Sequence, residues 1–407
     1  MTLNINRKFF ILAGETSGDY IGCSIIKGLK DREGSKTSFF GIGGPLMKEE
    51  GLNSIYEMND FNIMGFVNTI YNYKKLNNYK NNIINHILRE EPDAVITIDT
   101  KGFSFVLAKK LKYLFKKNNF KCPLIHFVPP TIWAYGKSRI KKWRNLHDGL
   151  FCLFKNEEHF FNQYNVKCYY VGNPIIENFI NINKVNNNRK TLYKKYNIQE
   201  RDFICLLFPG SRDTEINNIL SEFISLIKNN ENNKNKFRNI KWFIPTTKLQ
   251  YSKIVDKIRN TGISNIVKVI ILKDNYNILK CADIAIACSG TITLELVLFK
   301  IPTIAVYKTD LLSSFIGRML VDFRNVLLPN FLLERKLVPF LFQEKCQFKY
   351  INKLLYENIK EIETKKKLFE HASKEIIELM NYTKYQKETN FSSKSSYEII
   401  KIINSFS

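Results

Sequence analysis

Two turns in the second half of the chain carry glycine, hydroxyl and charged side chains in a pattern suited to phosphate. The first contains Gly210, Ser211 and Arg212, and lies between an apolar stretch at 203–208 and a helical pattern at 216–227. Glycine lets the backbone approach a ligand, the hydroxyl donates, and a helix N-terminus favours an anion. Arg212 adds a forked, permanently charged donor for phosphate oxygens. The same pattern also fits an ordinary surface turn between a strand and a helix.

The second turn contains Ser289, Gly290 and Thr291 and again separates an apolar stretch from a helical pattern. Glu295 follows four residues after Thr291, where its carboxylate could accept both hydroxyls of a ribose. The alternative is that Ser289 simply caps the helix that follows. Two phosphate-type turns with a downstream carboxylate together suggest a site for a nucleoside diphosphate.

Asp99 is the candidate for acid–base chemistry. It ends the apolar run 95–99, at the point where a strand gives way to the turn before a helical pattern. A carboxylate at such a position could take a proton from an attacking hydroxyl, and general-base catalysis contributes roughly 10²–10⁴-fold to a rate. The alternative is that Asp99 caps the helix that contains Phe103.

Two glycine-rich turns mark the first half of the chain. One contains Gly14, Ser17, Gly18 and Asp19, and the other, at 41–45, contains three glycines. Neither matches the dinucleotide pattern G-x-G-x-x-G, and no Walker-type G-x-x-x-x-G-K-[ST] is present. A nicotinamide cofactor is therefore disfavoured, and we expect no bound cofactor.

Two features raise the question of a membrane surface. The apolar run 63–67, with Met64 and Phe66, is either core or a face toward acyl chains. The 407 residues carry 62 Lys and Arg against 38 Asp and Glu, a net charge of +24. An AT-rich genome explains such a lysine excess, and an anionic phosphate or membrane partner is the functional alternative. Nucleic acid is not favoured, because no basic motif interleaved with aromatic residues stands out.

The composition also argues against several classes of protein. No stretch reaches about 18 uninterrupted apolar residues, which disfavours a membrane-spanning helix. The N-terminus lacks a convincing signal peptide, so we expect a cytoplasmic location. The eight cysteines form no Cys-x-x-Cys pair and several lie in apolar runs, as buried free thiols do. Neither they nor the five histidines suggest a metal site.

The elements that must position these residues alternate as strand, tight turn and helix. Strands are predicted at 9–13, 94–98, 124–128, 203–208 and 284–287, and helices follow most of them. This alternation predicts α/β architecture with parallel, doubly wound sheets, in which all the turns above meet at the carboxyl edges of the strands. The Asn/Lys-rich stretch 181–189 predicts a connection between two Rossmann-like domains that face each other across a cleft. We expect domains at 1–180 and 190–380, followed by a helical tail at 381–407.

A family resemblance emerges when the motifs are placed in order along residues 9 to 346. The segments that carry it are Ala13–Asp19, Gly41–Gly44, Met64–Val67, Ile98–Asp99, His126–Tyr135, Pro209–Arg212 with Glu215–Ile216, Ser289–Thr291 with Leu294–Glu295, Tyr307–Lys308 and Leu328–Asn330. In this order and spacing the sequence resembles the lipid-A-disaccharide synthases, which are inverting glycosyltransferases of the GT-B fold.

The resemblance implies a reaction in lipid A, and hence lipopolysaccharide, biosynthesis. The donor is UDP-2,3-diacylglucosamine, the acceptor is 2,3-diacylglucosamine 1-phosphate, and the products are the β-1,6-linked disaccharide phosphate and UDP. No metal or cofactor is implied. Because both substrates carry acyl chains, the resemblance implies a cytoplasmic enzyme that associates peripherally with the inner face of the membrane. A homo-oligomer is also possible.

The resemblance also implies roles for particular residues. Asp99 is the general base. The donor-side positions are Ser211, Arg212, Ser289, Gly290, Thr291, Glu295 and Asn330, and the acceptor-side positions are Gly14, Ser17, Gly18, Asp19, Met64 and Phe66.

Four positions depart from the family pattern. Lys101 replaces a proline and Asn173 replaces a histidine, while Lys336 and Phe340 each stand where the family usually has glutamate. These departures leave two alternatives open. One is a catalytically decayed protein that binds a UDP-sugar or a lipid, and the other is a different GT-B enzyme that uses a UDP-sugar.

Overall fold

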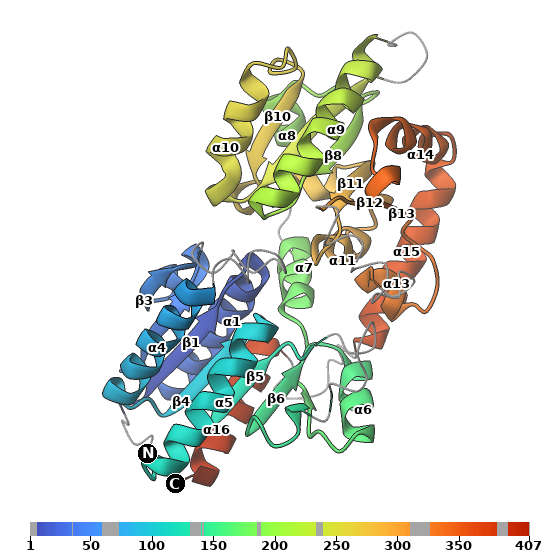
Figure 1. The fold of residues 1–407 in the computed structure, drawn as a ribbon. Helices are drawn as coiled ribbons and strands as arrows, with labels where there is room; N and C mark the ends of the chain where they lie inside the picture. The colour runs from blue at the N-terminus through green and yellow to red at the C-terminus, as the bar shows by residue number, and fades with distance from the viewer. Residues whose placement is uncertain are drawn as a thin grey trace. The chain divides into compact units, whose positions relative to one another are not determined.

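A computed structural model describes residues 6–34, 36–58, 73–130, 140, 142–184, 189–232, 239–309, 326–380 and 390–406. The chain divides into two compact units (Figure 1). Unit 1 comprises Met1–Glu177 and Met380–Ser407, and unit 2 comprises Asn178–Leu379. Each unit is built on its own parallel sheet, which confirms the α/β, doubly wound architecture expected from the sequence.

Unit 1 contains a seven-stranded sheet in the order β3-β2-β1-β4-β5-β6-β7, with all pairs parallel. Its strands are β1 (Lys8–Ala13), β2 (Ser38–Gly43), β3 (Leu52–Glu57), β4 (Ala94–Ile98), β5 (Leu124–Phe127), β6 (Gly149–Cys152) and β7 (Tyr169–Tyr170). The order reverses direction between β1 and β4, so the turns after these two strands flank a topological switch point, where ligands of open α/β sheets bind.

Helices cover both faces of this sheet (Figure 1). The helices of unit 1 are α1 (Thr16–Glu33), α2 (Pro45–Glu49), α4 (Tyr73–Glu90), α5 (Lys101–Lys117), α6 (Lys155–Gln163), α7 (Pro174–Lys184), which continues into unit 2, and α16 (Phe391–Phe406). On one face, α4 and α5 pack with Phe10, Leu12 and Val95 in a single core cluster. Strand side chains alternate between faces, so Ala13 and Ile98 point the other way, toward Gly18 of α1.

The sequence predicted a helical tail at 381–407, and the described part of this segment contains the helix α16. Within it, α16 packs lengthwise against α1 in unit 1. At Gly28 a Cβ atom would come within 2.1 Å of the Ser392 carbonyl oxygen, and the Phe391 ring lies 6.1 Å from that of Phe127 in β5. The apolar residues Phe391, Ile399 and Ile403 are buried. The helix returns to unit 1 because these side chains cover the face of the sheet that α1 leaves open.

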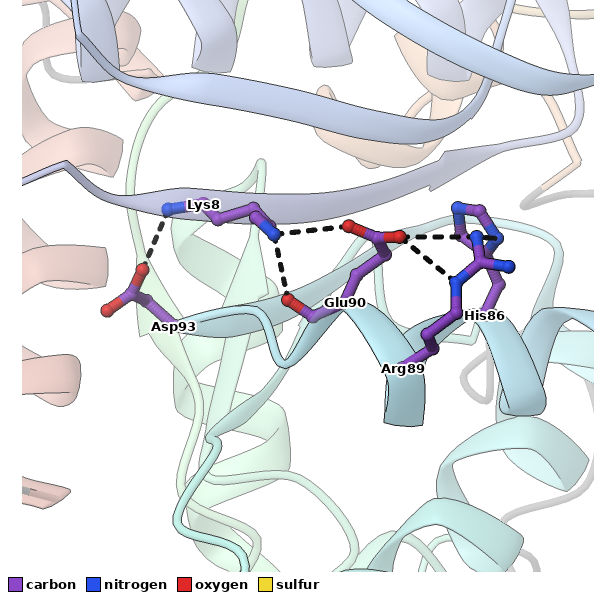
Figure 2. Close-up of polar contacts among 5 residues, drawn as sticks. All are labelled: Lys8, His86, Arg89, Glu90 and Asp93. Carbon is purple, nitrogen blue, oxygen red and sulfur yellow. Dashed lines mark hydrogen bonds and ion pairs between the residues drawn. The ribbon is translucent and has the colours of Figure 1, made fainter.

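The amino edge of the sheet is tied to the end of α4 by a chain of polar contacts (Figure 2). The Lys8 amide donates to Asp93 Oδ2 at 2.7 Å, and its Nζ contacts both the Glu90 carbonyl oxygen (3.0 Å) and Oε2 (3.1 Å). Arg89 donates to Glu90 Oε1 at 3.2 Å and contacts His86 Nδ1 at 2.9 Å. A lysine that binds the last carbonyl groups of a helix caps its C-terminus. This network is structural and lies at the edge opposite the switch point.

Unit 2 repeats the architecture with a six-stranded parallel sheet in the order β10-β9-β8-β11-β12-β13. The strands are β8 (Phe203–Phe208), β9 (Ile240–Thr246), β10 (Val267–Ile271), β11 (Ile284–Cys288), β12 (Thr303–Tyr307) and β13 (Phe340–Phe342). The α-helices that lie wholly within it are α8 (Arg189–Tyr196), α9 (Asp213–Asn232), α10 (Lys248–Arg259), α11 (Ile292–Leu298), α13 (Leu328–Leu332), α14 (Phe348–Lys360) and α15 (Ile362–Leu379). Successive residues of β8 belong to two different core clusters, so both faces of the sheet are buried. Here the switch point lies between β8 and β11.

Candidate active site

Two candidate residues of unit 1, Gly14 and Asp99, lie at its switch point. Ala13 pairs with Ile98 in the parallel register of β1 and β4, so Gly14 and Asp99 leave neighbouring strands at the same edge. Asp99 is half-buried, and its amide donates to the Phe127 carbonyl oxygen of β5 at 3.0 Å. The sheet therefore fixes the backbone of Asp99 at the place where ligands of this architecture bind.

The turn that carries Asp99 has an unusual backbone. Both Asp99 (φ 52°) and Thr100 (φ 44°) are left-handed, and Val128, at the end of the neighbouring strand β5, has φ 66°. Left-handed φ is uncommon outside glycine, and for a β-branched residue such as Val128 it is a genuine outlier. Residues held this way cost about 1–3 kcal/mol each and cluster at functional sites.

Hydrogen bonds hold this turn in place. The Thr100 and Ser104 hydroxyl oxygens are 2.8 Å apart, and Ser104 Oγ donates to the Asp99 carbonyl oxygen at 3.1 Å. The helix begins at Lys101 with Thr100 in the N-cap position. Asp99 therefore lies one residue before the cap, and the simple capping role that the sequence left open does not describe it.

Asp19 has a structural role that the sequence did not reveal. Its buried carboxylate accepts hydrogen bonds from the amides of Gly44 (2.9 Å), Leu46 (3.0 Å) and Met47 (3.0 Å), and so caps the N-terminus of α2. Burial raises the pKa of Asp19 despite these three donors. The hydrogen bonds of Asp19 therefore connect the two glycine-rich turns of the sequence. Gly44 belongs to this arrangement because a Cβ there would lie 2.4 Å from Asp19 Oδ2.

The other residues of the first turn lie closer to the switch point. Gly14 is buried directly after β1, and Ser17 is half-buried in the first turn of α1. Gly18 lets the helix approach the sheet, since a Cβ there would lie 3.2 Å from the Ala13 Cβ and 3.6 Å from Ile98 Cγ2. Met64 and Phe66 lie outside the described residues.

The candidate donor turns meet at the switch point of unit 2. Phe208 pairs with Ala287, so the turn after β8 and the turn after β11 leave adjacent strands. Glu215 and Arg212 both act on the pKa of Cys288, the last residue of β11, which burial raises well above its usual value. The sheet thus brings together the two turns that the sequence identified separately.

A carboxylate already occupies part of the first donor turn. Glu215 Oε2 accepts hydrogen bonds from the Ser211 amide (3.1 Å) and the Arg212 amide (3.2 Å), and Oε1 lies 3.3 Å from Arg212 Nη1. Gly210 has φ 114°, and a Cβ there would meet Glu215 Oε2 at 2.6 Å. Sequence reasoning gave no role to Glu215, although it lies three residues after Arg212, the residue before α9, which is the spacing of a capping box. It sets the position of the Arg212 side chain, which is 41% exposed.

The second donor turn presents hydroxyls, and the half-buried Glu295 follows it in α11. Ser289 is half-buried, while Gly290 and Thr291 are exposed. The residue in the N-cap position of α11 is Thr291, without a side-chain cap, so Ser289 is not the cap that the sequence allowed. Burial raises the pKa of Glu295 to about 7. Among the described residues its carboxylate has no hydrogen-bond partner.

The Asn330 side chain forms hydrogen bonds with the backbone of the loop that follows it. Its Oδ1 accepts from the amides of Leu337 (3.0 Å) and Val338 (2.8 Å), and its Nδ2 donates to the Val338 carbonyl oxygen at 2.9 Å. Nearby, Gln343 forms two hydrogen bonds with the backbone of Thr309, both 3.1 Å long. The side-chain amides of Asn330 and Gln343 thus fix the backbone of the segments next to β13. This arrangement favours a role for Asn330 in positioning that loop.

The four departures from the family pattern fit the local structure. Lys101 is the first residue of α5, where the expected proline is only one of several suitable residues. Asn173 precedes Pro174 of α7 and its Oδ1 accepts from the Ile175 amide at 3.0 Å, which is an N-cap. Lys336 is exposed, and the Phe340 ring packs 6.0 Å from that of Phe342.

No cluster of three or more His, Cys, Asp or Glu side chains in the described part of the chain is arranged to hold a metal ion. Nor does any helix in the described ranges have the length and hydropathy needed to cross a membrane.

Comparison with known proteins agrees with the sequence motifs. The family model for lipid-A-disaccharide synthetase matches residues 9–395. The lipid-A-disaccharide synthase of Wigglesworthia glossinidia brevipalpis is 32% identical over 377 residues, which cover 90% of this chain and 92% of that protein. The enzyme of the same name from Francisella tularensis subsp. novicida is 29% identical, with 97% of each chain covered.

Solved structures show the same fold at low identity. The S. aureus MnaA–UDP structure has a TM-score of 0.59 at 15% identity, with 99% of this chain and 97% of that one covered. The calicheamicin glycosyltransferase CalG4 also has a TM-score of 0.59, at 8% identity, with 98% of this chain and 99% of that one covered. Both likenesses support two Rossmann-like domains. The match over nearly the whole length, together with motifs that converge on both switch points, shows that the chain belongs to the lipid-A-disaccharide synthase family of glycosyltransferases.

Proposed function

We propose that the chain condenses UDP-2,3-diacylglucosamine with 2,3-diacylglucosamine 1-phosphate to form the β-1,6-linked disaccharide 1-phosphate and UDP. The observation that carries this proposal is the family match across residues 9–395. The position of Asp99 at the end of β4, beside the switch point of unit 1, agrees with it.

Asp99 acts as the general base in this proposal. Its carboxylate takes the proton of the acceptor 6-hydroxyl, and the oxygen attacks the anomeric carbon of the donor from the side opposite UDP. One C–O bond forms as the bond to the diphosphate oxygen breaks, so the configuration inverts. A general base must be held within hydrogen-bond reach of its substrate. The bonds from the Asp99 backbone to Phe127 and Ser104 supply that fixed position.

Unit 2 binds the donor in this proposal. Glu295 accepts the two ribose hydroxyls, and Ser289, Gly290, Thr291 and Ser211 line the phosphates. Arg212 balances the charge that develops on the leaving diphosphate, which is the largest electrostatic requirement of the reaction. The family resemblance implies no metal ion, so the proposal assigns this charge balance to Arg212 and to backbone amides.

We further propose that the enzyme works in the cytoplasm, at the inner face of the membrane. Both substrates carry acyl chains that a bilayer holds, so a peripheral enzyme meets them at the lipid–water boundary. The positive net charge suits that location, because the cytoplasmic leaflet is negatively charged.

The test is to incubate the purified protein with both acylated substrates in detergent and to detect the products by mass spectrometry. Disaccharide phosphate and UDP in equal amounts would establish the reaction. A protein that binds UDP but forms neither product would support a decayed binding protein. Conversion of non-acylated UDP-N-acetylglucosamine in a parallel reaction would instead indicate another UDP-sugar enzyme.

A further inference from the structure

The positive charge of unit 1 is concentrated on one face of its sheet. Helices α4 and α5, which pack on that face beside α6, carry ten Lys and Arg residues against a single acid, Glu90. Helices α1 and α16, on the opposite face, carry five basic residues against four acidic ones. An AT-rich genome would enrich lysine on both faces alike. Such codon usage does not explain why α4 and α5 carry only one carboxylate between them.

The lysines of α5 differ from those of α15 in whether a carboxylate neutralises them. On α15, Lys365, Lys366 and Lys374 each form an ion pair with a nearby carboxylate. On α5, by contrast, none of the lysines with described side chains forms an ion pair with another described residue. All five, Lys109, Lys110, Lys112, Lys116 and Lys117, are exposed, and Lys112 donates to the Asn145 carbonyl oxygen. Their charges therefore remain available to an anionic partner.

Exposed apolar groups lie on the same surface of α5. Val106 is 49% exposed and Tyr113 is 60% exposed, and the Lys110 Nζ lies 5.4 Å from the centre of the Tyr113 ring. Tyrosine and lysine are both suited to a lipid–water boundary, since each has an apolar body and a polar end. The surface is therefore cationic with apolar projections, as expected for a protein face that lies on a membrane.

We infer that the α4–α5 face of unit 1 is the surface that binds the anionic lipid headgroups of the membrane. This inference rests on the proposed function, because that function places the acceptor in a lipid surface. A nucleic acid would be an alternative anionic partner, but the α5 cations are all lysines and none is an arginine. Lysine acts as a point charge, whereas arginine provides the forked contacts that recognise phosphates and bases.

The position of Asp99 fits this inference. Helix α5 begins two residues after Asp99, and Lys109 lies eight residues further along the helix than Lys101. At a rise of about 1.5 Å per residue, Lys109 is roughly 12 Å along the helix from the turn of the candidate base. A membrane bound along α5 would thus hold acylated acceptors close to the turn that carries Asp99.

The test is vesicle co-sedimentation of the full chain, with neutral phosphatidylcholine vesicles and with vesicles that contain anionic phosphatidylglycerol. We expect binding only to the anionic vesicles and a loss of binding as salt increases. The triple variant Lys109→Gln, Lys110→Gln and Lys116→Gln should bind about a hundred-fold more weakly, because each lysine near a charged bilayer contributes several-fold. The matched control neutralises Lys349, Lys353 and Lys360, which are exposed on α14 of unit 2.

Disaccharide formation from detergent-dispersed substrates is measured in parallel. The triple variant should keep this activity, since none of its residues belongs to the candidate site. Equal losses in the α5 and α14 variants would overturn the inference in favour of net charge alone. Unimpaired vesicle binding by the α5 variant, or binding by the parent chain to duplex DNA but not to vesicles, would also overturn it. If vesicle binding depends on the α5 lysines but no disaccharide forms, the proposed function is wrong, whereas the inference that this face binds lipid headgroups stands.

Discussion

At the scale of single residues, the carboxyl ends of β4 and β5 concentrate backbone strain where chemistry is expected. Asp99, Thr100 and Val128 all have left-handed φ, and none is glycine. Such conformations persist because other bonds impose them, here the Asp99 amide to Phe127 and the hydroxyl pair of Thr100 and Ser104. Asp99 therefore precedes Thr100, the N-cap residue of α5, in a backbone conformation that these bonds maintain.

Asp99→Asn should lower kcat about 10²–10⁴-fold, because an amide of nearly the same shape cannot take the acceptor proton. The measurement is the initial rate of disaccharide formation. Thermal unfolding and UDP affinity serve as controls, and both should match those of the parent chain. A variant with nearly unchanged turnover would remove Asp99 from the mechanism.

Glu295 makes the donor site sensitive to pH. Burial raises its pKa to about 7, so the carboxyl is mostly protonated below that pH and ionised above it. If the ionised form accepts the ribose hydroxyls, UDP affinity rises with pH and should be about ten-fold higher at pH 8 than at pH 6. Titration calorimetry at both values measures this. UDP also titrates near pH 6, so Glu295→Gln is the reference, and it should show a clearly smaller change. The same pH dependence in both proteins would rule out Glu295 as its source.

At the scale of elements, Asp19 connects α1 to the N-terminus of α2. One carboxylate there satisfies three backbone amides that α2 cannot satisfy itself. The loop between β2 and α2 thereby acquires a fixed position at the edge that also carries Gly14. Asp19 thus supports the candidate acceptor side by holding the loop, and its carboxylate is already used by the protein.

Asp19→Ala should lower the free energy of unfolding by about 2 kcal/mol, since three amides lose their acceptor and an N-cap is removed. Urea unfolding measures this change. Asp31→Ala is the matched control, because Asp31 is exposed on the same helix, and it should change stability by less than about 0.5 kcal/mol. Equal effects of the two substitutions would show that the Asp19 hydrogen bonds contribute little.

The sequence predicted the elements that carry an uninterrupted apolar run. Strands β1, β4, β5, β8 and β11 were all expected, as were the turns after β1, β4, β8 and β11. The local sequence pattern could not show which side chains bind the backbone of a distant segment. Asp19 binds amides 25 to 28 residues away, and Asn330 binds amides seven and eight residues away. Such contacts depend on the folded positions of both partners, so no spacing in the sequence identifies them.

At the scale of the whole molecule, the chain leaves unit 1 after Glu177 and returns to it at Met380. Glu177, at the start of α7, accepts a hydrogen bond from the Phe391 amide at the start of α16. Further along α16, Arg32 donates to Ser396 Oγ (3.2 Å) and Arg7 donates to Asn404 Oδ1 (3.0 Å). Unit 1 is therefore complete only when the last residues of the chain have folded onto it.

Gly28→Ala tests this dependence with a single methyl group. The added Cβ would lie 2.1 Å from the Ser392 carbonyl oxygen, so α16 must move away from α1. Overpacking of this kind costs about 1–3 kcal/mol. Hydrogen exchange read by mass spectrometry should show lost protection in peptides from 391–406, with no change in peptides from 203–288 of unit 2. The matched control is Gly102→Ala in α5, where the new methyl group has no neighbour within 4 Å. It should leave exchange unchanged or slightly slower, because alanine favours a helix.

Full protection of 391–406 in Gly28→Ala would show that unit 1 does not depend on the close approach of α16.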